Sequence, residues 1–125
     1  MMIIGIGTDV IEITRIRESI EKFGDRFISK IFTDAEVAYC SSKADPPLHY
    51  SGRFAVKEAV VKALSHIYKG AYTFPEIEVL NEADGIPKVY LRGRLEGVLT
   101  GNLVIHVSLS HSVSVASGMA VISSD

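Results

Sequence analysis

The end of the chain is almost free of charge, and this limits the possible folds more than any other feature. Residues 97–124 contain no Asp, Glu, Lys or Arg. From 103 to 109 the odd-numbered positions are all Leu, Ile or Val, which is the period of a strand with one buried face. A second strand is predicted over 115–122, after a turn at 110–112. Strands this apolar need cover from a core or from another subunit.

Composition narrows the class of protein. The 125 residues, 47% hydrophobic and 22% charged, predict one globular domain over 1–125. A formal charge of -2 argues against a nucleic-acid partner. The single cysteine, Cys40, is predicted to be a packed helical residue. The apolar start at 1–4 is shorter than a signal or membrane segment, so we expect a soluble cytoplasmic protein with no membrane attachment.

Helices are predicted early in the chain and hairpins late. A buried strand is expected over 2–6, followed by a helix over 10–23 that ends at Gly24. A short helix begins at the capping box of Thr33 and Glu36, and a loop is expected over 41–47. The rest of this part is predicted to be a long helix over 49–68, hairpin strands over 74–80 and 87–92, and one or two helical turns within 94–100. This order predicts an α+β fold with helices packed on a small antiparallel sheet.

Asp9 follows a glycine-rich turn and has two interpretations. It is a natural helix N-cap, and Glu12 resembles the acidic half of a capping box. It is also a candidate metal ligand. Gly5 and Gly7 lack the third glycine of a dinucleotide fingerprint and the lysine of a P-loop, so they are a weak signal for phosphate.

The segment 53–62 is rich in charged groups. Glu58 and Lys62 are four residues apart and share a helix face that points away from the apolar stripe. In one interpretation they form an exposed ion pair. In the other, Asp9 and Glu58 are oxygen ligands of Mg²⁺, while Lys62 and Arg53 neutralise a bound phosphate.

Three further residues are candidates for binding. His111 lies near a turn, where serine neighbours offer donors for phosphate, and its alternative is a solvated turn histidine. His106, within the strand, is predicted to be structural. Arg15 and Lys22 share a helix face that is either simply solvated or receives an acidic partner.

Three motifs together resemble one family. They are Gly-Ile-Gly-Thr-Asp at 5–9, Arg-Phe-Ala-Val-Lys-Glu-Ala at 53–59, and Val-Ser-Leu-Ser-His-Ser at 107–112. In this order and spacing they resemble the bacterial holo-[acyl-carrier-protein] synthases, the small type of 4'-phosphopantetheinyl transferase. The resemblance covers essentially the full length and implies the transferase fold.

The resemblance implies a reaction. The 4'-phosphopantetheine group of coenzyme A passes to a serine of apo acyl carrier protein, adenosine 3',5'-bisphosphate is released, and the holo-carrier serves fatty acid biosynthesis. It further implies a homotrimer with the substrate cleft between adjacent subunits. The resemblance implies that Asp9 and Glu58 bind Mg²⁺ and that Lys62 contacts the pyrophosphate. It implies that Arg53, His111 and Ser112 bind the phosphates of the adenosine moiety. Arg15 is the implied contact for the carrier, and Lys22 lies on the same face.

Some alternatives stay open at this point. The serine proton is taken either by Glu58 or by a water on the metal. A metal-dependent hydrolase would use the same carboxylates to cleave the pyrophosphate of coenzyme A or a nucleotide with water. A binding module would hold coenzyme A or the carrier without turnover.

Overall fold

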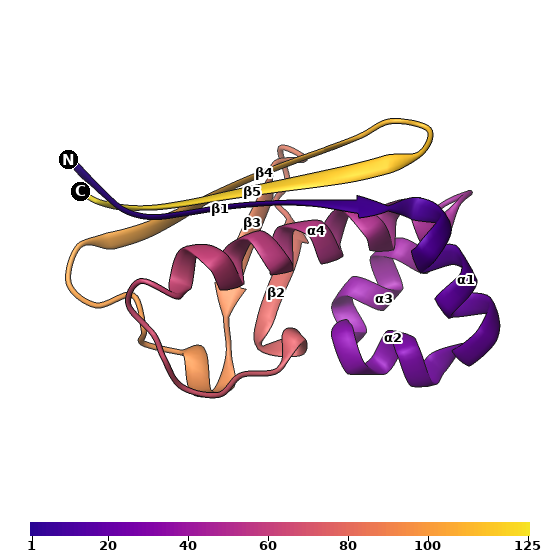
Figure 1. Cartoon of the computed structure of the whole chain (residues 1–125), viewed down its shortest axis with the longest axis horizontal. Coiled ribbons are helices and arrows are strands. Elements are labelled where there is room, and N and C mark those ends of the chain that lie inside the picture. Colours follow the sequence, from indigo (N-terminus) through magenta and orange to yellow (C-terminus); the bar gives the residue numbers. More distant parts are fainter.

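The computed structural model describes all residues 1–125 (Figure 1). In chain order the elements are β1 (Met2–Glu12), α1 (Ile13–Phe23), α2 (Asp25–Ile31), α3 (Asp34–Ser41), α4 (Pro46–Leu64), the 3-10 turn η1 (Phe74–Glu76), β2 (Ile77–Asn81), β3 (Pro87–Leu91), the 3-10 turn η2 (Gly93–Leu95), β4 (Leu103–His111) and β5 (Val115–Ser124).

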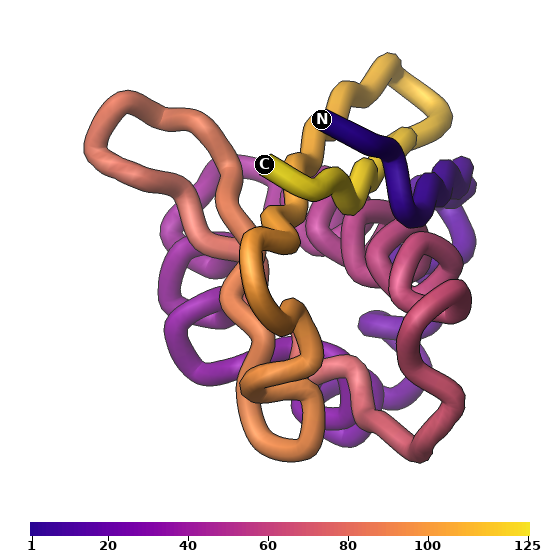
Figure 2. The backbone as a smooth tube through the Cα atoms, turned by 90° about the vertical axis from the view of Figure 1, so that its left-hand side faces the viewer, coloured from indigo at the N-terminus to yellow at the C-terminus, as the bar shows by residue number.

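An antiparallel sheet in the order β1-β5-β4 lies on one side of α4, and the β2-β3 hairpin forms a separate two-stranded sheet (Figure 1). Helices α1 to α3 gather at one end of α4. The two chain ends lie side by side, and the Met2 amide donates to Ser124 Oγ at 3.0 Å. The tip of the hairpin projects from the body (Figure 2). The predicted α+β class, with helices on a small antiparallel sheet, is confirmed.

Glycines allow β1 and β5 to lie directly against α4. A Cβ added at Gly7 would lie 2.0 Å from the Ala59 carbonyl oxygen, and one added at Gly118 would lie 2.5 Å from the carbonyl carbon of Ala55. Real Cβ atoms do not approach backbone this closely, so these strand positions accept only glycine without movement.

We expect Gly7→Ala to destabilise the fold by about 1 to 3 kcal/mol, because the added methyl must push β1 away from α4. Urea unfolding at constant protein concentration measures the effect. The neighbouring Thr8 is exposed, so Thr8→Ala should stay within about 0.5 kcal/mol of the parent. Equal stabilities of the two variants would contradict the close packing.

Two predicted helix boundaries were wrong at their starts. The helix predicted from Val10 begins at Ile13, because residues 10–12 stay in β1 and pair with residues 115–117 of β5. The predicted loop over 41–47 was too long, since α4 begins at Pro46. Proline has no amide hydrogen to lose in a first helical turn, so two prolines there begin the helix and do not break it.

Other differences are smaller. Helix α4 ends at Leu64, and a turn replaces the helix predicted as far as Tyr68. Helix α2 was not predicted at all, and Gly24, with φ of 56°, ends α1 and directly precedes it. The helical turns predicted within 94–100 reduce to η2.

A buried ion pair joins three elements. Lys57 Nζ donates to Glu36 Oε1 at 2.8 Å, and both side chains are fully buried. Lys57 also donates to the carbonyls of Phe74 (3.0 Å) and Ile77 (2.6 Å), while Glu36 Oε2 accepts from the Val79 amide at 2.7 Å. Burial lowers the pKa of Lys57, and the Glu36 carboxylate opposes that shift. The pair therefore fastens α3 and α4 to β2.

Individual residues match or contradict their predictions. The capping box of Thr33 and Glu36 is confirmed. Cys40 is buried in α3, and burial raises the pKa of its thiol to about 11, so it packs as predicted. His106 does not point into a packing layer, because it is exposed on the outer face of β4, where Nε2 lies 3.3 Å from Ser123 Oγ.

No helix combines the length and the apolar character needed to cross a bilayer.

Candidate functional site

Asp9, Glu58 and Lys62 meet where the edge strand β1 passes over α4. Lys62 Nζ donates to Asp9 Oδ1 and to the Thr8 carbonyl, each at 2.9 Å. The N-cap interpretation of Asp9 is wrong, because Asp9 lies inside β1 opposite Gly118, and α1 begins four residues later. The exposed Glu58–Lys62 pair is also absent, since Lys62 pairs with Asp9.

The two carboxylates of this site act on each other. Partial burial raises the pKa of Glu58, the negative charge of Asp9 raises it further, and Lys62 opposes both. A hard cation would relieve this repulsion, and carboxylate oxygens are its preferred ligands. No third acidic residue, histidine or cysteine joins the pair. Two carboxylates therefore fit an ion such as Mg²⁺, which completes its shell with water and substrate oxygens.

Arg53 forms a second centre, on the other side of α4. Its side chain is only 3% exposed, its guanidinium lies over the Tyr39 ring at 3.9 Å, and it donates to Asn81 Oδ1. Its Nε has no hydrogen-bond partner. A buried guanidinium with an unused donor is costly to keep, which indicates a place for an anion.

Arg53 lines a cavity of about 260 Å³ between α4, the β2-β3 hairpin and the end of β4. His111 and His49 also line this cavity. The pKa of His49 is lowered, mainly by burial and further by the positive charge of Arg53. Sequence reasoning missed His49, Tyr39 and Asn81 as lining residues. Residues 43–69 hold five Lys or Arg against two Asp or Glu, which is the only sequence signal for this cavity. Elements that are distant in the sequence had to fold together to form it.

Ser112 lies at the turn between β4 and β5. Its amide donates to the Val115 carbonyl at 2.8 Å, and its hydroxyl lies 3.4 Å from the amides of Ser114 and Val115. Ser112 and His111 both line a neighbouring cavity of about 440 Å³ that reaches Ile13 of α1. The predicted pair of His111 and Ser112 is thus brought to the cavity region.

The two centres do not meet within one chain. Asp9 lies on β1. Leu109 and His111, which line the Arg53 cavity, lie on β4. Strand β5 separates these two edge strands. Around α4, Glu58 and Lys62 face β1, whereas Arg53 faces the hairpin. The resemblance implies a cleft between adjacent subunits, and the fold of one chain keeps Asp9 and His111 on opposite edge strands of the sheet.

Arg15 and Lys22 lie on α1, away from both centres. Arg15 is exposed and lies 3.6 Å from Glu12, and Lys22 Nζ lies 5.3 Å from the centroid of the Phe23 ring. The unpredicted helix α2 adds two basic residues, Arg26 and Lys30, beside Phe23 and Phe27 in a shallow cavity. This end of the molecule presents basic and aromatic groups together.

The outer face of the three-stranded sheet, opposite α4, exposes several large apolar side chains. Ile6 and Val10 of β1, Met119 of β5 and Val104 of β4 are between 42% and 62% exposed. Nothing in the chain covers them. Several exposed large apolar side chains on one face favour an interface there.

Comparisons with known proteins identify the family. Residues 5–116 match the model of the 4'-phosphopantetheinyl transferase superfamily. A holo-[acyl-carrier-protein] synthase of Protochlamydia amoebophila is 42% identical over 98% of this chain and 100% of its own. The structure of such a synthase from Neisseria meningitidis is 31% identical, with a TM-score of 0.87 over 98% of this chain and 99% of that one.

A third comparison includes a ligand. A holo-(acyl-carrier-protein) synthase from Bacillus anthracis, solved in complex with CoA (3',5'-ADP), is 32% identical, with a TM-score of 0.78 and full coverage of both chains. The resemblance in the three motifs is thereby confirmed. The chain belongs to the holo-[acyl-carrier-protein] synthases, which are enzymes of the 4'-phosphopantetheinyl transferase superfamily.

Proposed function

We propose that this enzyme transfers 4'-phosphopantetheine from coenzyme A to a serine hydroxyl of apo acyl carrier protein in the cytoplasm. The products are adenosine 3',5'-bisphosphate and the holo-carrier that fatty acid biosynthesis requires. The observation that carries the proposal is the convergence of Asp9, Glu58 and Lys62 in a chain of this family. Domain 1–125 would act as one unit.

Lys62 is proposed to hold the pyrophosphate. An ammonium group has three donors, and Asp9 and the Thr8 carbonyl use two of them. The third can donate to a phosphate oxygen while the lysine stays in place. Held in this way, the ammonium would stabilise the charge that develops during transfer.

Asp9 and Glu58 are proposed to bind Mg²⁺. When bound, the ion would neutralise the pyrophosphate and the charge on the leaving oxygen. Glu58 is also the proposed acceptor of the serine proton. With no cation bound, partial burial and the charge of Asp9 raise the pKa of Glu58, which makes it a stronger base than an ordinary carboxylate.

Arg53, His111 and Ser112 are proposed to bind the phosphates of the adenosine moiety. Arg53 and His111 line the same cavity, so an anion there could receive donors from both residues.

We also propose that the active enzyme is a homotrimer with its substrate site between subunits. Lys62 faces β1 and Arg53 faces the hairpin on the other side of α4, and β5 separates the β1 and β4 edges of one chain. A site between the β1 edge of one subunit and the β4 edge of another would let one ligand contact both groups. The exposed apolar face of the sheet supplies the surface to be buried.

Arg15 and Lys22 are proposed to contact the carrier. Arginine suits interface ion pairs, and α2 extends the basic surface. An acidic partner would be attracted to this end of the molecule, and salt would weaken that attraction.

The function is tested by mass spectrometry of an apo carrier incubated with the protein, coenzyme A and Mg²⁺, with and without chelator. A chelator-sensitive gain of one phosphopantetheine supports the transferase. Cleavage of coenzyme A with no carrier present supports the metal-dependent hydrolase. Bound coenzyme A without any product supports the binding module.

Lys62→Ala should raise the KM for coenzyme A and lower kcat together, by a combined factor on the order of 10² to 10³. The substitution removes a donor that contacts the pyrophosphate both before and during transfer. Steady-state kinetics against coenzyme A measure the effect. Lys88→Ala, the same change at an exposed position of β3, leaves the Asp9 pair intact and is the control. Kinetics like those of the parent would reduce Lys62 to a structural partner of Asp9.

Subunit mixing tests the shared site. Asp9→Ala and Arg53→Met, which keeps the buried stem, should each be inactive alone. Refolded as a 1:1 mixture, they should regain about a quarter of the parental activity, because that share of interfaces joins an intact Asp9 to an intact Arg53. A mixture that stays inactive, although sedimentation shows mixed trimers, would place the whole site within one chain.

A further inference from the structure

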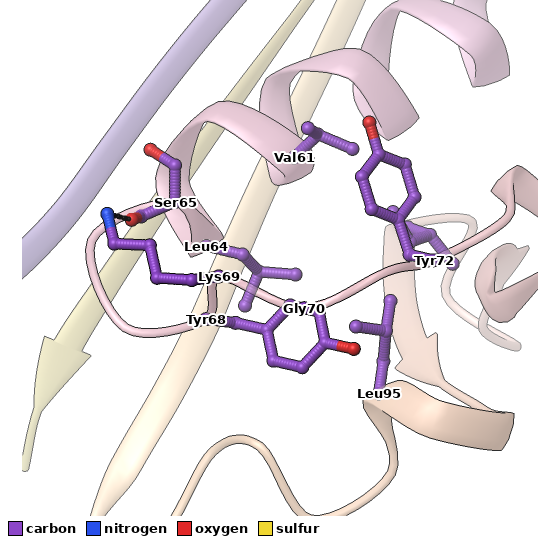
Figure 3. A pocket seen from close by; sticks show the side chains of 9 residues that line it. Val61, Leu64, Ser65, Tyr68, Lys69, Gly70, Tyr72 and Leu95 are labelled. Carbon is purple, nitrogen blue, oxygen red and sulfur yellow. Dashed lines mark hydrogen bonds between the residues drawn. The ribbon is translucent and has the colours of Figure 1, made fainter.

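Helix α4 borders two cavities of different character. The cavity beyond its C-terminal end is mostly apolar, with Ser65 and Lys69 together at one end and Tyr72 at the other (Figure 3). The cavity at Arg53 has few apolar lining residues and several basic ones. Like charges repel each other, so the basic groups at the Arg53 cavity need partners that hold them in place.

Carboxylates do not supply these partners. The basic cluster at the cavity consists of Lys43, His49, Arg53 and His111. Neither Lys43 nor Arg53 forms an ion pair. Burial lowers the pKa of His49, and the charges of the other three members lower it further, while Asp45 opposes them. The two carboxylate oxygens of Asp45 already accept from the Arg17 guanidinium, at 2.9 and 3.1 Å. The basic cluster therefore keeps most of its positive charge uncompensated.

The aromatic ring of Tyr39 is one partner of the basic cluster. The centre of the Arg53 guanidinium lies 3.9 Å from the centroid of this ring, and Lys43 Nζ lies 4.6 Å from the same centroid. The His49 ring meets it edge-on, with the two centroids 6.1 Å apart. An aromatic ring attracts cations through its quadrupole and has no net charge. Tyr39 therefore holds two cations without neutralising them.

The side-chain amide of Asn81 is the other partner. Its Oδ1 accepts from Arg53 Nη2, and its Nδ2 donates to the Gly85 carbonyl at 2.8 Å. Asn81 thus joins Arg53 to the turn of the β2-β3 hairpin, at the position where it pairs with Pro87. An amide oxygen accepts a hydrogen bond without adding a negative charge. The guanidinium is oriented by this contact and keeps its charge.

We infer that Tyr39 and Asn81 are positioning residues, which hold the Arg53 guanidinium with neutral partners so that its charge stays available to the phosphates of the adenosine moiety. The inference rests on the proposed function. A carboxylate in either place would bind Arg53 more strongly and would compete with a phosphate. Neutral partners offset only part of the cost of burying Arg53, and a bound anion would offset the rest. Nε of Arg53, a buried donor without a hydrogen-bond partner, agrees with this division.

Asn81→Asp separates positioning from support of the fold. The new carboxylate can still accept from Arg53, so urea unfolding should show a folded variant. Its negative charge competes with the phosphates, so the Kd for adenosine 3',5'-bisphosphate, measured by titration, should rise about fivefold or more. Asn102→Asp is the matched control, because Asn102 is the only other asparagine and lies before the far end of β4 from His111. The control should bind as the parent does.

Two substitutions of Tyr39 test the ring. Tyr39→Leu removes it, and the Kd for adenosine 3',5'-bisphosphate should rise about five- to tenfold. Tyr39→Phe keeps the ring and should restore the parental Kd. In donor kinetics, Tyr39→Leu should raise the KM for coenzyme A and leave kcat within about twofold, because the contact is the same before and during transfer. A variant that had only lost folded protein would instead show a lower kcat at an unchanged KM.

Equal affinity of Asn81→Asp and Asn102→Asp for the bisphosphate would overturn the role of Asn81. Tyr39→Phe as weak as Tyr39→Leu would overturn the role of the ring, and so would a loss of kcat alone in Tyr39→Leu. Binding of the bisphosphate requires no transfer. A parent that binds it but leaves the carrier unmodified would therefore contradict the proposed function, while the same titrations would still decide the roles of Tyr39 and Asn81.

Discussion

Asp9→Ala is expected to lower kcat/KM for carrier modification by a factor on the order of 10² to 10³ while leaving the fold intact. The substitution removes one of two carboxylates that fit a metal, and it also releases Lys62 from its 2.9 Å contact. Mg²⁺ affinity, measured by titration in the absence of substrate, should fall with the activity. The two readouts together separate loss of the metal from loss of the lysine position.

Stability distinguishes this expectation from the N-cap interpretation. Asp9 is in a strand and caps no helix, so we expect the free energy of unfolding to change by less than about 1 kcal/mol. Asp34→Ala, the same substitution at an exposed position of α3, is the control for charge. Normal turnover by Asp9→Ala would contradict a role of Asp9 in metal binding. The proposed transfer of phosphopantetheine would then lose its main support.

Local patterns predicted the elements that depend on local contacts. The capping box of Thr33 and Glu36, the hairpin around Gly85 and the alternation of β4 are all present. Errors occurred where tertiary pairing decided the outcome. Val10 fits a helical stripe and a strand equally well, and pairing with Ser117 of β5 kept it extended.

The sequence suggests candidate residues for the site, and the fold determines how they are arranged. Spacing placed Glu58 and Lys62 on one face, Asp9 was a candidate metal ligand beside them, and the fold brings Asp9 to Lys62. The burial of Arg53 and the lining role of His49 depend on the hairpin docking against α4, which no local pattern encodes. Lys57, in the same charged segment, is fully buried, which its helical position alone does not predict.

Lys57→Met is expected to have the largest effect on stability, a loss of about 3 to 5 kcal/mol. The side chain of Lys57 is fully buried, and its ammonium is the charged partner of Glu36 and a donor to two backbone carbonyls. Methionine fills similar volume but leaves a buried carboxylate without a counter-charge. Since small proteins have only about 5 to 15 kcal/mol of stability, the variant should be close to unfolding.

The double variant Glu36→Gln with Lys57→Met separates charge from packing. A neutral amide at 36 can still accept from the Val79 amide, which now bonds Glu36 Oε2 at 2.7 Å, and no unpaired charge remains. Urea unfolding at neutral pH should therefore find the double variant more stable than Lys57→Met alone. If the two losses simply added, the cost would lie in packing, and the ion pair would not be what fastens α3 and α4 to β2.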